Sequence, residues 1–153
     1  MRPPHHHGAG ASLCVSDSTL IFECMFDPWA KVSELGIDVH TVPLEQLSGC
    51  TDGTTIWLDT HLTTTERRCT LTHELVHLTR GHTGHLPQAA EDAVREETAR
   101  LLVSWEGLHA HCGAQLEIWH LAQELGVTPQ VLADRIRHAS AEERCALHGC
   151  IAS

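Results

Sequence analysis

The stretch TTTERRCTLTHELVHLTRG, residues 63–81, predicts the helix around which the rest of the fold is built. Thr63 is followed three positions later by Glu66, which is the pattern of a capping box at a helix start. Gly81 follows Arg80 and suits the end of the same helix. Three leucines recur within it at helical spacing and predict a buried face: Leu71, Leu75 and Leu78.

Within this helix lies the motif H-E-x-x-H, residues 73–77. Residues four apart on a helix project from the same face, so His73 and His77 can both reach one zinc ion at roughly 2.0–2.1 Å. Glu74 lies beside them, where it can take a proton from a water molecule and later return it. The motif also arises by chance in roughly one such sequence in ten, on a solvated helix. Its place in a capped, amphipathic helix favours a zinc-dependent hydrolase.

A catalytic zinc needs a third protein ligand and an open position for water. His82 and His85 follow the motif closely, but the longer metzincin pattern requires glycine and histidine where this chain has Arg80 and Thr83. That arrangement is excluded. A glutamate from the next helix, expected over residues 88–105, is the alternative.

Helical geometry gives two candidates for that glutamate. Glu91 borders one side of the apolar face of residues 88–105, and Glu97 borders the other side, whereas Glu96 points away. A carboxylate buried against His73 and His77 is costly without a cation, so a glutamate there favours a metal. The apolar face itself consists of Ala90, Val94, Leu101, Leu102 and Trp105.

The remaining elements predict an α+β fold. We expect a strand over residues 54–59, and if it is an exposed edge above the site, it could pair with an extended substrate. The other expected elements are a helix over 27–36, a strand over 37–42, a turn over 48–53, and helices over 114–125 and 128–138.

Composition and length predict one folded domain. The chain has 153 residues, 42% of them hydrophobic, and no run of the roughly 18 apolar residues that a membrane span needs. We place the domain at 19–145, between a disordered leader at 1–18 and a flexible tail at 146–153. The formal net charge of −10 argues against a nucleic-acid-binding surface.

The seven cysteines form no Cys-x-x-Cys pair, and the N-terminus lacks the apolar core of a secretory signal. We therefore expect a reduced, cytoplasmic protein with structural thiols. One alternative is a second metal site, although its residues lack a known ligand spacing. These residues are His109, His111, Cys112, Cys145, His148 and Cys150.

Three blocks of the sequence resemble the ImmA/IrrE family of metallopeptidases, in particular its short actinobacterial and actinophage members. They are TTIWLD at 54–59, ERRCTL at 66–71 and the HELVH motif at 73–77. A fourth block, EDAVREETARLLV at 91–103, resembles the family's next helix, where Glu-x-x-Ala or Glu-x-x-Val supplies the third zinc ligand. That register selects Glu91. The resemblance extends over roughly residues 27–145.

The resemblance implies a small gluzincin-like zincin domain, with a short sheet packed on the HExxH helix. It also implies one zinc ion held by His73, His77 and Glu91, with Glu74 as the catalytic residue. Family members typically cleave a helix-turn-helix repressor of a phage or mobile element. This chain departs from the family at Arg95, where relatives usually carry Asn or Asp. It also has no tyrosine to stabilise an oxyanion, so His82, His85 or an arginine would serve.

Two other functions fit parts of the sequence. The protein could be a zinc-binding regulator that contacts a repressor without hydrolysing it. It could also bind DNA, because residues 121–137 are similar to a helix-turn-helix. The second helix of that motif carries Arg135 and Arg137 but also Asp134, and the net charge opposes this function.

Overall fold

Three short strands form one mixed sheet in the computed structural model, which describes residues 25–151. The central strand is β3 (Thr55–Asp59), which pairs in parallel with β1 (Asp38–Val42) and antiparallel with β2 (Gly49–Thr51). The strand predicted at 54–59 is present, but it is the central strand of the sheet and not an exposed edge that could pair with a substrate. The segment expected as a turn contains β2, which pairs along β3 and becomes the edge strand instead.

Helix α3 (Thr64–Thr79) packs on this sheet, and helix α2 (Pro28–Leu35) packs against α3 and contributes Val32 to the same core. The predicted capping box is confirmed: the Thr63 amide donates to Glu66 Oε2 over 2.8 Å, and the Glu66 amide donates to Thr63 Oγ1 over 3.2 Å. Alternate side chains of β3 point into the core against α3, which is the pattern of a sheet with one covered face. The buried residues of this core are Val32, Ile56, Leu58, Leu71 and Leu75.

The helix expected over residues 88–105 is two helices. α4 (Gln88–Leu102) begins as predicted, after Pro87, but it ends because Val103 is extended. Ser104 then caps α5 (Trp105–Ala110) by accepting a hydrogen bond from the Gly107 amide over 3.0 Å. Trp105 therefore belongs to the second helix.

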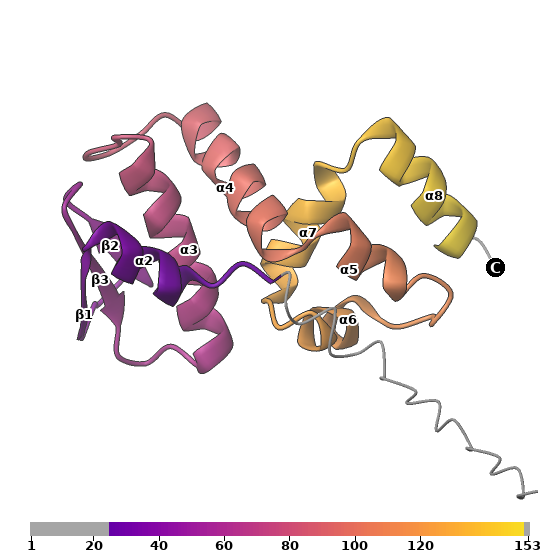
Figure 1. Ribbon diagram of the computed structural model, residues 1–153, viewed down its shortest axis with the longest axis horizontal. Coiled ribbons are helices and arrows are strands. Elements are labelled where there is room, and N and C mark those ends of the chain that lie inside the picture. Colours follow the sequence, from indigo (N-terminus) through magenta and orange to yellow (C-terminus); the bar gives the residue numbers. More distant parts are fainter. Residues whose placement is uncertain (1–24, 152–153) are drawn as a thin grey trace, which may run out of the picture.

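The C-terminal helices are α6 (Ile118–Glu124), α7 (Pro129–Arg137) and α8 (Ala141–Ile151). Figure 1 shows the sheet with α2 and α3 at one end of the molecule, α5, α6 and α8 at the other, and α4 and α7 between them. α8 covers most of the range 146–153 that we expected to be a tail. It begins at a capping box, because the Ser140 amide donates to Glu143 Oε2 and the Glu143 amide donates to Ser140 Oγ.

The described residues thus form an α+β fold with a three-stranded sheet and seven helices, as the sequence predicted in outline. The leader expected at 1–18 lies outside them. A second core of leucine, valine and alanine side chains joins α4 to α5–α8. Along the described chain, no helix combines the length and the apolar character needed to cross a membrane.

Candidate metal centre

Helices α3 and α4 bring two imidazoles and one carboxylate together. The Nε2 atoms of His73 and His77 lie 3.1 Å apart. Glu91 Oε2 lies 3.6 Å from His73 Nε2 and 3.4 Å from His77 Nε2. Among the described residues, this is the group of three potential ligands whose donor atoms all lie within 4.8 Å of one another. The structure therefore joins the motif on α3 to the glutamate that the family register selected.

The spacing of these atoms fits a metal ion. Ligand atoms around a tetrahedral zinc, each about 2.0–2.2 Å from the ion, are separated by roughly 3.3 Å. The three observed separations scatter around that value. Two nitrogen donors and one oxygen donor also match a metal that accepts imidazole and carboxylate and keeps a position open for water.

Both histidines favour the neutral form that binds metals. Burial, together with the nearby charges of His77 and Arg95, lowers the pKa of His73 from its usual 6.5 to about 4, although Glu91 opposes this shift. Burial also lowers the pKa of His77, which is 8% exposed. Without a metal, the two rings are therefore neutral near pH 7, as a metal ligand must be.

His82 supports the outer side of His77. The two Nδ1 atoms lie 3.2 Å apart, while His77 Nε2 faces His73 and Glu91. If His82 Nδ1 accepts the proton of His77 Nδ1, the Nε2 lone pair of His77 is free to bind a metal. His85, by contrast, is exposed at the rim of the same cleft.

Glu74 is buried beside the two histidines. Glu74 is 8% exposed. Burial, together with the smaller effect of the charge of Glu91, raises the pKa of its carboxyl from 4.5 to about 7. Gly49 of β2 lies directly against it: a Cβ at residue 49 would be 3.2 Å from Glu74 Cγ. The same Cβ would be 2.6 Å from Thr70 Cγ2, so only glycine fits here without displacement.

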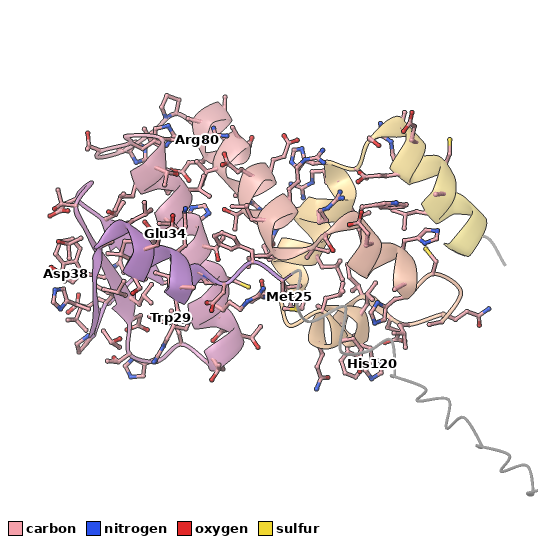
Figure 2. All side chains as sticks on the ribbon, in the orientation of Figure 1. Met25, Trp29, Glu34, Asp38, Arg80 and His120 are labelled. Atoms are coloured by element: carbon pink, nitrogen blue, oxygen red, sulfur yellow. The ribbon has the colours of Figure 1, made fainter. Side chains whose placement is uncertain are left out.

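Glu97, the other candidate for the third ligand, has a different partner. The Nε atom of Arg80 donates to Glu97 Oε2 over 2.7 Å, and the Glu97 side chain is 40% exposed. Arg80 is labelled in Figure 2 at the C-terminal end of α3. Glu96 lies in an exposed pair with Arg100 at 3.2 Å. Neither carboxylate belongs to the group formed by His73, His77 and Glu91.

The three residues open onto a cleft of about 870 Å³. One wall of the cleft is β2 with the preceding residues 47 and 48, and the opposite wall is formed by α4 and α7. Among its lining residues are Glu74, His82 and His85, together with Arg95 and Thr98 from α4. Such a cleft has room for several residues of a peptide.

Sequence reasoning missed several lining residues. It treated Gly49 as part of a turn, and it noted Arg95 only as a departure from relatives. The position of Arg95, one turn after Glu91 on the same helix face, was the available sign that it lies in the same cleft. Among the described residues, His109, His111, Cys112 and Cys145 form no candidate metal group, and the side chains of His148 and Cys150 lie outside the description.

Comparison with known proteins agrees with the family that the sequence resembles. Residues 32–137 match the family model Peptidase_M78, whose description is IrrE N-terminal-like domain. This match spans more than half of the chain and includes the sheet, α3, α4 and α7. No curated protein and no solved structure matches the chain significantly. On the evidence of the family match, the chain belongs to the peptidase family of the IrrE N-terminal-like domain.

Proposed function

We propose that this protein is a zinc-dependent endopeptidase in which His73, His77 and Glu91 hold one zinc ion. The observation that carries the proposal is the convergence of these three side chains within 4.8 Å, beside a buried glutamate in a cleft. A bound zinc would polarise the scissile carbonyl and make a water molecule more acidic. The gluzincin arrangement, with a glutamate from the following helix as third ligand, is part of this proposal.

In this proposal Glu74 is the catalytic proton carrier. Its carboxylate takes a proton from the water that attacks the peptide carbon and delivers it to the nitrogen of the leaving amine. Burial favours this role, because it raises the affinity of the carboxyl for a proton toward the value needed near neutral pH. Gly49 keeps β2 in contact with the side chain and so limits its movement.

The edge strand β2 is suited to hold an extended substrate. It pairs with β3 along one side only, and Gly49, Cys50 and Thr51 line the cleft. An unpaired strand edge can accept the main chain of a peptide as an additional strand. β2 thus takes the role that the sequence had suggested for residues 54–59.

The substrate we propose is a helix-turn-helix repressor of a phage or mobile element, encountered in the cytoplasm. This substrate class rests on the resemblance to ImmA/IrrE proteins, while the family match supports the peptidase activity. The position of α7, which would be the recognition helix, argues against direct binding to DNA. Arg135 is 2% exposed and donates to Glu143, and Arg137 lies 3.3 Å from Asp134. These arginines already have partners within the protein.

The test is hydrolysis of a defined peptide pool and of candidate repressors by the zinc-loaded protein, read by mass spectrometry. The wild type should cleave at a defined set of bonds, whereas Glu74→Gln should bind zinc equally and cleave at least about 100-fold more slowly. Glu97→Gln is the matched control, because it removes a carboxylate outside the site. Normal cleavage by Glu74→Gln would overturn the mechanism, and zinc binding without any cleavage by the wild type would favour a non-catalytic regulator.

A further inference from the structure

The part of the cleft beyond the metal centre has features that the proposed reaction does not use. There the wall consists of α4 and α7, opposite β2. Arg95 lies one helical turn after Glu91, and Thr98 follows it by three residues, so all three share one face of α4. The residues contributed by α7 and its N-cap are Thr128, Gln130, Val131 and Asp134.

Arg95 is held in place by a buried carboxylate. Its Nε donates to Asp134 Oδ2 over 2.9 Å, and its Nη2 donates to Asp134 Oδ1 over 3.0 Å. Asp134 is 3% exposed, and Gln130 Nε2 also donates to it over 3.2 Å. This two-pronged pairing fixes the plane of the guanidinium. The third nitrogen, Nη1, makes no hydrogen bond to a described residue, and the side chain is 32% exposed.

Thr98 offers a second donor without a partner. The residue is 3% exposed, and its Oγ1 is buried without a hydrogen bond to any residue that the structure describes. A buried hydroxyl without a partner costs roughly 1–3 kcal/mol. A bond to the carbonyl one turn earlier, which helical threonines can make, is not made here. The hydroxyl therefore has no partner, and it belongs to a residue that lines the cleft.

The local charges favour a neutral acceptor over a carboxylate. Asp134 pairs with Arg95 and also lies 3.3 Å from Arg137. Apart from the proposed zinc ligand Glu91, the other acidic residues that line the cleft are Glu66 and Glu74, and a carboxylate form of either would repel a negatively charged side chain. A carbonyl oxygen carries no net charge and can accept hydrogen bonds from two donors at once. In a peptide, the acceptor present at every residue is the main-chain carbonyl.

We infer that Arg95 Nη1 and Thr98 Oγ1 form a subsite that binds a main-chain carbonyl oxygen of the peptide substrate. The inference rests on the proposed peptidase function and adds to it a second anchoring point, on the wall opposite β2. Arg95 and Thr98 are binding residues in this scheme. They hold one residue of the substrate at a fixed distance from the zinc-binding side chains on α3 and α4.

The experiment measures peptide binding in the Glu74→Gln background, where turnover does not interfere. The probe is the tightest-binding member of a synthetic octapeptide pool, followed by isothermal titration calorimetry with zinc-loaded protein. Arg95→Lys keeps a positive charge opposite Asp134 but has no third nitrogen to share. It should weaken binding about tenfold, and the melting temperature should fall as well because one of the two hydrogen bonds to buried Asp134 is lost.

Thr98→Val separates a binding role of the hydroxyl from a structural one. Valine has nearly the same shape and removes a buried polar group that has no partner, so the melting temperature should stay the same or rise. Peptide binding should fall about threefold. The control is Arg100→Met, an exposed arginine of the same helix that does not line the cleft and should bind like the parent.

A thioamide scan identifies the group that is bound. Replacing each carbonyl oxygen of the probe in turn by sulfur, a weaker acceptor, should weaken binding to the parent at one position. At that position the replacement should have a smaller effect in Arg95→Lys, and it should have none in the double variant Arg95→Lys/Thr98→Val. The inference would be overturned if the losses from the thioamide and from Arg95→Lys were additive at every position. It would also be overturned if Arg95→Lys bound the probe like the parent, or if the effect of Arg95→Lys depended on a side-chain carboxylate of the probe instead.

A fall in kcat with unchanged peptide binding would assign Arg95 to the reacting oxyanion and also overturn the inference. If the wild type binds the probe but never cleaves it, the proposed hydrolysis fails independently of the subsite.

Discussion

Gly49 of β2 and Glu74 of α3 lie so close together that a Cβ at residue 49 would be 3.2 Å from Glu74 Cγ. Gly49→Ala should therefore push β2 away from α3, at a cost of about 1–3 kcal/mol in the free energy of unfolding. Because Glu74 would move with the contact, peptide hydrolysis should fall about tenfold or more. Urea unfolding measures the first effect. Hydrolysis of the peptide that the wild type cleaves fastest in the defined pool measures the second.

A second substitution tests the steric cause. The nearest atom to the added methyl group would be Thr70 Cγ2, at 2.6 Å. Thr70→Ala removes that atom, so the double variant should recover part of both losses, although the Trp57 carbonyl at 3.1 Å would still be crowded. If Gly49→Ala is as stable and active as the wild type, the close packing of β2 on the site is wrong.

The contact between His77 and His82 predicts a role for His82 in metal binding. His82→Phe keeps a ring of similar shape but removes the nitrogen that lies 3.2 Å from His77 Nδ1. Loss of such a supporting partner typically weakens metal affinity 10- to 100-fold, so we expect a decrease of at least about tenfold. His85→Phe is the control and should bind zinc like the wild type. Competition with a chromogenic chelator measures both, and equal affinities would contradict the prediction.

Burial of Glu74 predicts that the contribution of this carboxyl to the stability of the metal-free protein falls as pH rises, whereas the lowered pKa of His73 acts in the opposite direction between about pH 4 and 6.5. The pKa of this carboxyl is about 7 in the folded protein, against 4.5 for an unperturbed group. This carboxyl therefore binds more protons in the folded state between these values, and its contribution to stability falls across that window by up to roughly 3 kcal/mol. Glu74→Gln removes the effect. Urea unfolding in the presence of a chelator measures the difference. The variant should be more stable than the wild type at pH 8, and this stability difference should be much smaller at pH 4.5. A pH-independent difference would refute the assignment.

The pair formed by Arg135 and Glu143 predicts a loss of stability in acid. Hydrogen bonding to Arg135, followed by the Ser140 amide, lowers the pKa of Glu143 to about 2. A carboxyl with a lowered pKa stabilises the fold above its usual pKa of 4.5, and this contribution disappears as pH falls from 4.5 toward 2. In Glu143→Gln, the melting temperature should depend less on pH over that range than in the wild type. In Glu142→Gln, which changes an exposed residue, the pH dependence should be that of the wild type. Parallel curves for Glu143→Gln and the wild type would contradict the prediction.

Sequence patterns predicted the elements whose signals are local. The capping box at Thr63 and the leucines of α3 locate that helix almost to the residue, and Pro87 marks the start of α4. Thr128 and Pro129 similarly mark the start of α7. Caps and periodic leucines act within a few residues, so a sequence alone contains what they need.

Elements that depend on distant partners were missed. Gly49–Thr51 is a strand because it pairs with β3 and packs on α3, and three residues that begin with glycine carry little strand propensity of their own. The break between α4 and α5 depends on an extended Val103, whose carbonyl accepts a hydrogen bond from Arg135 across 32 residues. Tertiary contacts decided both cases.

The candidate site likewise contains residues that local helix spacing predicts and residues that only tertiary packing places. The H-E-x-x-H spacing places His73, Glu74 and His77 because the helix itself sets their geometry. The distinction between Glu91 and Glu97 needed the packing of α4 on α3, which turns Glu91 toward the histidines and leaves Glu97 to Arg80. Arg95 and Thr98 became interpretable only once the cleft and the unpartnered Thr98 hydroxyl were visible.

The zinc affinity of Glu91→Ala tests the central claim most directly, with Glu97→Ala as its matched control on the same helix. Zinc content after dialysis against zinc and then buffer, measured by mass spectrometry, should be one ion per chain for the wild type and for Glu97→Ala. Glu91→Ala should retain little zinc, because two imidazoles remain of a three-residue site. Equal zinc content in the wild type and in Glu91→Ala would contradict a metal centre formed by His73, His77 and Glu91.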